Sequence, residues 1–161
     1  MGKVYKTVRL AHETKYWIDC IIEKRTKELQ KEIKGNRIIP EIREEVFRLH
    51  EQSLDGVSIS INLNVTNSSI IEQAVRFSRN ISKQVWIKTI AMDMEKDIKR
   101  IQCDSFDDSI PRLHINEEIL EELEKMRLDF KEAGKRIPRL SYVVKLVVYA
   151  FQKEYLQECN G

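Results

Sequence analysis

The nine residues 57–65 (VSISINLNV) constrain the fold more than any other part of the chain. Apolar residues occupy every odd-numbered position, and serine or asparagine occupies every even-numbered one. This period of two predicts a β-strand with one buried and one exposed face. Residues 66–80 and 82–101, which follow, carry apolar residues at helical spacing, so no hairpin partner lies next in the chain. Because a lone strand leaves its backbone groups unpaired, its partner must come from elsewhere.

Composition favours an ordered, helix-rich protein. The 161 residues are 42% hydrophobic and include only five glycines and three prolines. The formal net charge of +2 favours no particular class of partner. No apolar run is long enough to span a membrane, and the start MGKVYKTVRL lacks the apolar core of a signal peptide. We therefore expect a cytoplasmic protein without a membrane partner.

The sequence contains no recognisable catalytic or metal-binding motif. Nucleophile elbow, P-loop and HExxH patterns are absent. The potential metal ligands are scattered along the chain: Cys20, Cys103 and Cys159, and His12, His50 and His114. Such spacing predicts neither a zinc cluster nor a disulfide framework. We expect no enzyme activity, no metal or other cofactor and no small-molecule ligand.

Two further segments resemble the central strand, and helical patterns follow all three. The last inward residues of the three segments, Leu10, Leu63 and Ile115, recur at nearly equal spacing. Apolar residues lie eight and eleven positions after each of these three residues. The pairs are Ile18 and Ile21, Ile71 and Ala74, and Leu123 and Met126. This similarity predicts an internal repeat with units at residues 3–52, 57–102 and 109–156, the first being the least regular. The connectors are residues 53–56 and 103–108.

Candidate N-caps mark the start of the expected helices. They are Thr14 in the first unit, Thr66 or Asn67 and Ser82 in the second, and Asn116 and Ser141 in the third. The expected fold class is therefore mostly α with short β-ribbons.

A strand followed by two helices, with serine capping the second helix, resembles the ribbon-helix-helix superfamily of DNA-binding proteins, the Arc, MetJ and CopG type. The matching segments are TVRLAHETKYWIDCII, SISINLNVTNSSIIEQAV and PRLHINEEILEELEKM, with ISKQVWIKTIAM and RLSYVVKLVVYAF as second helices. The resemblance implies that strands of two units pair antiparallel and that this ribbon enters the DNA major groove. With three units, two can pair within the chain while the third strand pairs with a second chain, giving the homodimer that we favour; the alternative is that the odd unit has decayed into a cap.

The resemblance also assigns roles to individual residues. The implied base-reading residues are Tyr5, Thr7 and Arg9, then Ser58, Ser60 and Asn62, then Arg112 and His114. The implied phosphate-binding residues are Lys3, Lys6, Ser82, Lys83, Arg139 and Ser141. The third strand departs from the pattern, because Pro111 removes a ladder donor and Ile110 stands where a polar reader is expected. For this third ribbon, a purely structural role is therefore an alternative to reading DNA.

These observations predict sequence-specific binding of double-stranded DNA by a prokaryotic, plasmid or viral transcriptional repressor. Two alternatives stay within the DNA-binding class, a plasmid partition protein and an accessory protein of a conjugative relaxosome. A third comes from another class, a helical oligomeric adaptor in which strand pairing serves assembly only. The modest net charge keeps this last alternative open, since DNA-binding proteins are often more basic.

Overall fold

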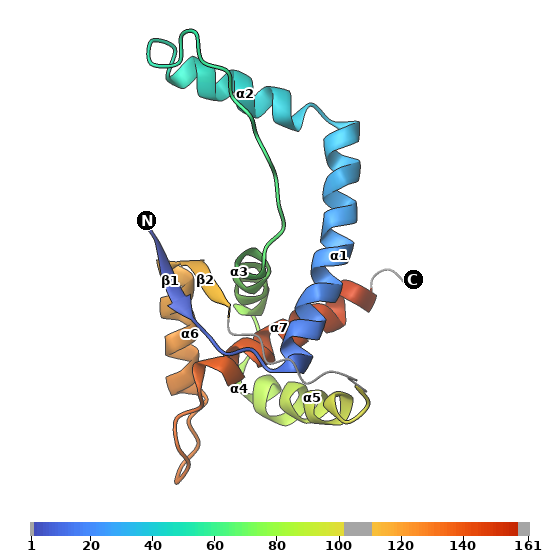
Figure 1. Cartoon of the computed structure of the whole chain (residues 1–161). Helices are drawn as coiled ribbons and strands as arrows, with labels where there is room; N and C mark the ends of the chain where they lie inside the picture. The colour runs from blue at the N-terminus through green and yellow to red at the C-terminus, as the bar shows by residue number, and fades with distance from the viewer. Residues whose placement is uncertain (1, 102–110, 158–161) are drawn as a thin grey trace. The chain divides into compact units, whose positions relative to one another are not determined.

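The computed structural model describes residues 2–101 and 111–157 (Figure 1). Ile110, the connector 103–108 and Cys159 lie outside these residues. The described part is mostly helical with one two-stranded sheet, which confirms the expected fold class at this coarse level. Its elements are β1 (Lys3–Thr7), α1 (His12–Gly35), α2 (Ile38–Leu49), α3 (Asn67–Ser78), α4 (Lys83–Val85), η1 (Trp86–Ile90, one π-helical turn), α5 (Ala91–Ile98), β2 (Arg112–Asn116), α6 (Glu117–Asp129) and α7 (Leu140–Gln157).

The sheet joins the first and third predicted strands within one chain. β1 and β2 run antiparallel, with Tyr5 opposite His114 and Thr7 opposite Arg112. The side chains of Leu113 and Ile115 are buried, while those of Arg112 and His114 are exposed. This alternation sets one apolar face of the ribbon against the core and leaves a polar face open to solvent.

The strand predicted at residues 57–65 is not formed. The segment carries no regular secondary structure and is drawn as a plain trace between α2 and α3 (Figure 1). Its alternation persists in the burial pattern, since Ile59, Ile61 and Leu63 are half-buried while Ser58 and Ser60 are exposed. A strand requires a hydrogen-bonded partner. β1 and β2 pair with each other, and no other described strand pairs with this segment.

The chain divides into two compact units. Unit 1 combines Met1–Ile22 with Thr66–Gly161, and unit 2 is Glu23–Val65. All the buried core residues among those described belong to unit 1, and none lies in unit 2. The hydrophobic core that holds the ribbon is therefore built by unit 1 alone.

Helix α7 forms the centre of that core. Its residues from Val143 to Phe151 are buried except for Lys145, and α3 packs along it. From the first turns of α1, the Trp17 ring packs on the Tyr149 ring with a centroid distance of 5.1 Å. The Tyr149 hydroxyl donates to Asp97 Oδ2 at 2.5 Å. Burial, together with this acceptor, raises the pKa of the Tyr149 phenol.

Several predicted helix starts are confirmed. The Thr66 hydroxyl accepts from the Ser69 N–H at 3.1 Å and forms a capping box, and Ser82 caps α4. Asn116 is the residue before α6. Two predicted caps are wrong: Thr14 lies buried inside α1, and Ser141 lies within α7, which begins one residue earlier.

Candidate nucleic-acid interface

The solvent-facing side of the ribbon carries an aromatic and cationic stack. The rings of Tyr5 and His114, which face each other across the ladder, lie nearly parallel at 11° with a centroid distance of 4.3 Å. The guanidinium carbon of Arg112 lies 4.3 Å from the centre of the Tyr5 ring. Tyr5 is nevertheless 59% exposed. The stack therefore holds these side chains in place on an open surface.

The two predicted lysines of this region lie on opposite faces of the ribbon. Lys6 lies opposite Leu113 and so belongs to the other face of the ribbon from Tyr5, although it is exposed. Lys3 shares the Tyr5 face, and its Nζ lies 3.6 Å from Glu72 Oε1. The predicted phosphate-binding residue Lys3 is therefore already paired with a carboxylate.

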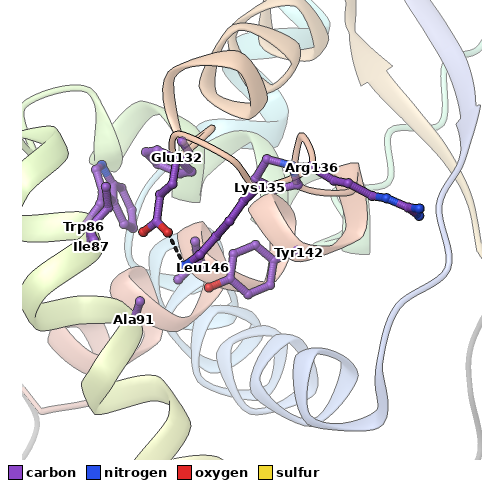
Figure 2. A pocket seen from close by; sticks show the side chains of 10 residues that line it. Trp86, Ile87, Ala91, Glu132, Lys135, Arg136, Tyr142 and Leu146 are labelled. Atoms are coloured by element: carbon purple, nitrogen blue, oxygen red, sulfur yellow. Dashed lines mark ion pairs between the residues drawn. The ribbon is translucent and has the colours of Figure 1, made fainter.

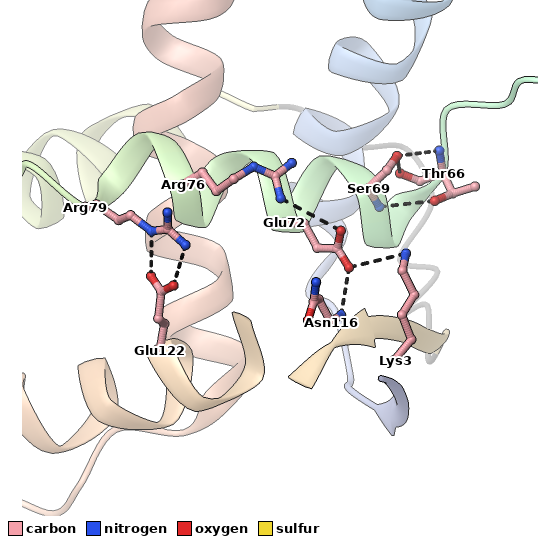
Figure 3. A network of polar contacts seen from close by, with 8 residues as sticks. All are labelled: Lys3, Thr66, Ser69, Glu72, Arg76, Arg79, Asn116 and Glu122. Atoms are coloured by element: carbon pink, nitrogen blue, oxygen red, sulfur yellow. Dashed lines mark hydrogen bonds and ion pairs between the residues drawn. The ribbon is translucent and has the colours of Figure 1, made fainter. Parts of the chain in front are cut away.

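Helix α3 covers the outer edge of β2 (Figure 3). The His114 N–H donates to Ser68 Oγ at 2.9 Å, and the Asn116 N–H donates to Glu72 Oε1 at 2.8 Å. Glu72 is only 7% exposed. Backbone donors that β2 would present to solvent thus have fixed acceptors, which anchors the ribbon on unit 1. This role of Glu72 was not predicted from the sequence, where the available signal is an acidic residue beside the apolar Ile71.

A cationic cavity lies where β1 leads into α1 and where α7 begins. Its volume is about 310 Å³, and its walls are formed by Arg9, Ala11, Arg139, Ser141, Tyr142 and Lys145. The structure therefore brings Arg9, predicted to read bases, together with Arg139 and Ser141, predicted to bind phosphate. Arg9 lies beyond the end of β1 and is not part of the ladder. The amino end of α7 adds the partial positive charge of its helix dipole to this cavity.

The charge of Lys145 in this cavity is balanced by a buried carboxylate. Its Nζ lies 3.2 Å from Glu13 Oε1, and Glu13 is 6% exposed. Burial alone raises the pKa of the Glu13 carboxyl. The hydrogen bond from its own backbone N–H, the charge of Lys145 and that of His12 outweigh burial, and the pKa lies below its usual 4.5. Glu13 thus balances Lys145, and the side chains of Arg9 and Arg139 line the same cavity.

The remaining predicted residues lie elsewhere. Ser58, Ser60 and Asn62 are exposed in unit 2 and do not belong to the β1–β2 ribbon. The Ser82 hydroxyl accepts from the Val85 N–H at 3.4 Å, so it serves the helix start. Lys83 lines a different cavity together with Arg79 and Glu122. The predicted set is therefore divided among separate places on the molecule.

A further cavity is lined by residues of the first turns of α7 (Figure 2). Its volume is about 250 Å³, and Trp86, Phe130, Tyr142 and Leu146 are among the side chains that line it. Lys135 pairs with Glu132 at this cavity, whereas the guanidinium of Arg136 points away from the other labelled side chains (Figure 2). Trp86 opens the π-helical turn, a distortion often found at functional positions. Tyr142 lines both this cavity and the cationic cavity.

Comparisons with protein-family models, with curated proteins and with solved structures find no match. Within residues 2–101 and 111–157, no helix has the length and apolar character that a membrane crossing requires. The same residues contain no cluster of three or more side chains suited to hold a metal ion.

Proposed function

We propose that the chain binds double-stranded DNA in a sequence-specific manner through the exposed face of the β1–β2 ribbon. The observation that carries this proposal is the stack of Tyr5, His114 and Arg112 on that face. A two-stranded ribbon fits the width of the major groove, where each base pair presents a distinct pattern of donors and acceptors. Helix α3 fixes the ribbon edge, so these side chains meet the DNA in a prepared arrangement.

Each part of the interface has a separate task in this proposal. Arg112 donates a pair of hydrogen bonds to guanine, held in direction by the Tyr5 ring on which it lies. Thr7, opposite Arg112 in the ladder, contributes a hydroxyl that can contact several bases. Arg9, Arg139 and the amino end of α7 bind a backbone phosphate at the cationic cavity. Base contacts set sequence preference, while phosphate contacts set affinity and position.

Such a protein needs no chemistry of its own. A chain that occupies an operator blocks the access of polymerase, so the proposed role is that of a transcriptional repressor. Plasmid partition and conjugative DNA processing use the same kind of binding. The biological circuit depends on the DNA sequence that the ribbon prefers.

The decisive experiment selects bound duplexes from a random pool and then measures affinity over a range of salt concentrations. We expect one enriched sequence and a log–log salt slope of roughly −0.9 for each phosphate contacted. Arg112→Ala should weaken binding to the selected duplex by about 5- to 150-fold, which corresponds to about 1–3 kcal/mol, and should relax one base position. Arg100→Ala is the matched control, because Arg100 is exposed, lies two residues after the end of α5 and belongs to neither strand of the ribbon. Equal affinity for all duplexes would contradict sequence-specific reading.

One observation favours the adaptor as a second candidate function. Unit 2 contains apolar residues but no buried residue among those described, so its surface suits an assembly. An adaptor without DNA contacts would show no binding in the same assay at any salt concentration.

A further inference from the structure

Three aromatic rings line the cavity of about 250 Å³ at the first turns of α7, those of Trp86, Phe130 and Tyr142 (Figure 2). We call it the aromatic cavity. Trp86 and Phe130 are only 3% and 9% exposed, and their rings pack with a centroid distance of 5.7 Å and a tilt of 54°. Rings that already pack against each other provide a preformed wall for a flat apolar ligand.

The π-helical turn places two of the residues that line this cavity. The Ala91 N–H donates to the carbonyl of Trp86, five residues earlier in the chain. A turn closed in this way brings residues five apart to the same side of the helix, whereas an α-helix aligns residues three and four apart. The large Trp86 and the small Ala91 therefore both line the aromatic cavity, together with Ile87.

Polar groups meet on one side of the aromatic cavity. Lys135 pairs with Glu132 there, and the Tyr142 hydroxyl points toward this pair (Figure 2). Burial, together with the charges of Glu95 and Glu132, raises the pKa of the Tyr142 phenol, so the hydroxyl keeps its proton at neutral pH. Within the described part of the chain, this hydroxyl has no hydrogen-bond partner. It is therefore able to donate to a ligand.

The charges on this side favour an anion. Lys135 and Arg136 are two cations on the lining, and Glu132 is a single carboxylate, so one positive charge is left over. The hydrogen bond to Glu132 raises the pKa of Lys135, and its ammonium has three N–H donors, more than Glu132 alone requires. Arg136 forms no ion pair with another residue that the structure describes. A ligand carboxylate would balance this charge.

We propose that the aromatic cavity binds a small planar aromatic carboxylate. The ligand ring lies against Trp86 and Phe130, and its carboxylate accepts hydrogen bonds from Lys135 and from the Tyr142 hydroxyl. Sites for drug-sized ligands measure about 300–1,000 Å³, so this smaller cavity suits one or two fused rings with a short acidic side chain. The proposal does not rest on DNA binding, because no lining residue belongs to β1 or β2.

Calorimetric titration of the full chain tests the ligand class. The probes are indole-3-acetate and its neutral amide, which share one ring system and differ in the charge of the side chain. We expect the acid to bind with a dissociation constant on the order of 10–100 µM, reasonable for so few atoms, and the amide to bind about 10-fold more weakly. Salicylate and phenylacetate are further acid probes. The proposal is wrong if none of the three acids binds below about 1 mM, or if indole-3-acetate and its amide bind equally.

Lys135→Gln tests the contact with the carboxylate. This variant should lower the affinity for indole-3-acetate to that of the amide and leave the affinity for the amide unchanged. Lys131→Gln is the matched control, because Lys131 belongs to the same connector and is exposed but does not line the cavity. Its affinities should equal those of the wild type. An equal loss in both variants would mean that the acid responds only to the overall charge, which would overturn the assigned contact.

Ala91→Leu tests the location of the site. The larger side chain occupies space beside Trp86 and should weaken binding of the acid and the amide alike, by roughly 10-fold or more. Val85→Leu is its control, since Val85 lies in the same helical stretch but is 44% exposed and does not line the cavity. Circular dichroism confirms that each variant is folded. A folded Ala91→Leu protein with wild-type affinity would overturn the location. Lys135 is exposed, so the Lys135→Gln test holds even if Ala91→Leu does not fold.

Discussion

Tyr5 and His114 face each other across the β1–β2 ladder, and their rings stack with a centroid distance of 4.3 Å on the side of the ribbon that faces solvent. The pair joins residues far apart in the sequence, so it fixes how the start of the chain meets the α6–α7 region. Arg112 lies over the same Tyr5 ring. One tyrosine thus contributes to the register of the sheet and to the direction of a proposed base contact.

Removing the Tyr5 ring should cost little stability. We expect Tyr5→Ala to lower the free energy of unfolding by about 0.2–1 kcal/mol, the usual value of a cross-strand aromatic pair. Tyr5→Phe retains the ring and should match the wild type. Urea unfolding followed by tryptophan fluorescence measures both. A loss of several kcal/mol for Tyr5→Ala would mean that the ring supports the core rather than the exposed face.

Glu72 should matter far more than an exposed glutamate. It is buried and accepts from the Asn116 N–H at 2.8 Å while it pairs with Lys3 (Figure 3). Glu72→Ala leaves that N–H without its acceptor, and we expect a loss of about 1–3 kcal/mol in the free energy of unfolding.

The control for Glu72 is Glu122. Glu122 accepts from Arg79 at 2.6 Å on the surface, and Glu122→Ala should change stability by only about 0–1 kcal/mol. Glu72→Gln keeps an oxygen acceptor and should fall between the two alanine variants. Equal effects of Glu72→Ala and Glu122→Ala in urea titrations would show that α3 does not anchor β2.

Acid should weaken unit 1 through Glu13. The pKa of the folded Glu13 carboxyl lies below its usual 4.5, so ionised Glu13 stabilises the fold above that pH. This contribution is lost as the pH falls through the lowered pKa. Wild type should therefore be more stable than Glu13→Gln at pH 7, and the difference should shrink steadily below about pH 4.5. Urea midpoints measured from pH 7 to pH 3 check this; a constant difference would exclude titration of Glu13 as its source.

Features of the fold that depend on neighbouring residues were easier to predict than features that depend on residues far apart in the sequence. Local signals predicted the apolar helix α7 and the caps at Thr66 and Ser82 from neighbouring residues, although the caps predicted in the same way at Thr14 and Ser141 were wrong. The strand at residues 57–65 was predicted from equally clear alternation, yet a strand exists only with its partner. The sequence does not state which strand pairs with which, because strand pairing joins distant segments.

In the candidate site, too, local patterns were predictive and contacts between separate elements were not. Arg112, His114 and Tyr5 were predicted on one face, and period two places them there. The contact of Glu72 with Asn116 and that of Glu13 with Lys145 were not predicted, since each joins separate elements whose packing no local pattern records. Arg9 lies at the cationic cavity and not in the ladder because β1 ends at Thr7, two residues before Arg9.

Arg9 and Arg112 should therefore respond differently to the same substitution. Arg9 lies at the cationic cavity with Arg139 and the start of α7, where a phosphate is the proposed ligand, whereas Arg112 lies on the ribbon face. Arg9→Ala should weaken binding to selected and unrelated duplexes by the same factor and should reduce the steepness of the log–log salt slope by about 0.9. Arg112→Ala should weaken binding mainly to the selected duplex. Fluorescence anisotropy with both duplexes over a salt series separates the two results. Loss of sequence preference in Arg9→Ala, with an unchanged salt slope, would instead place Arg9 against a base.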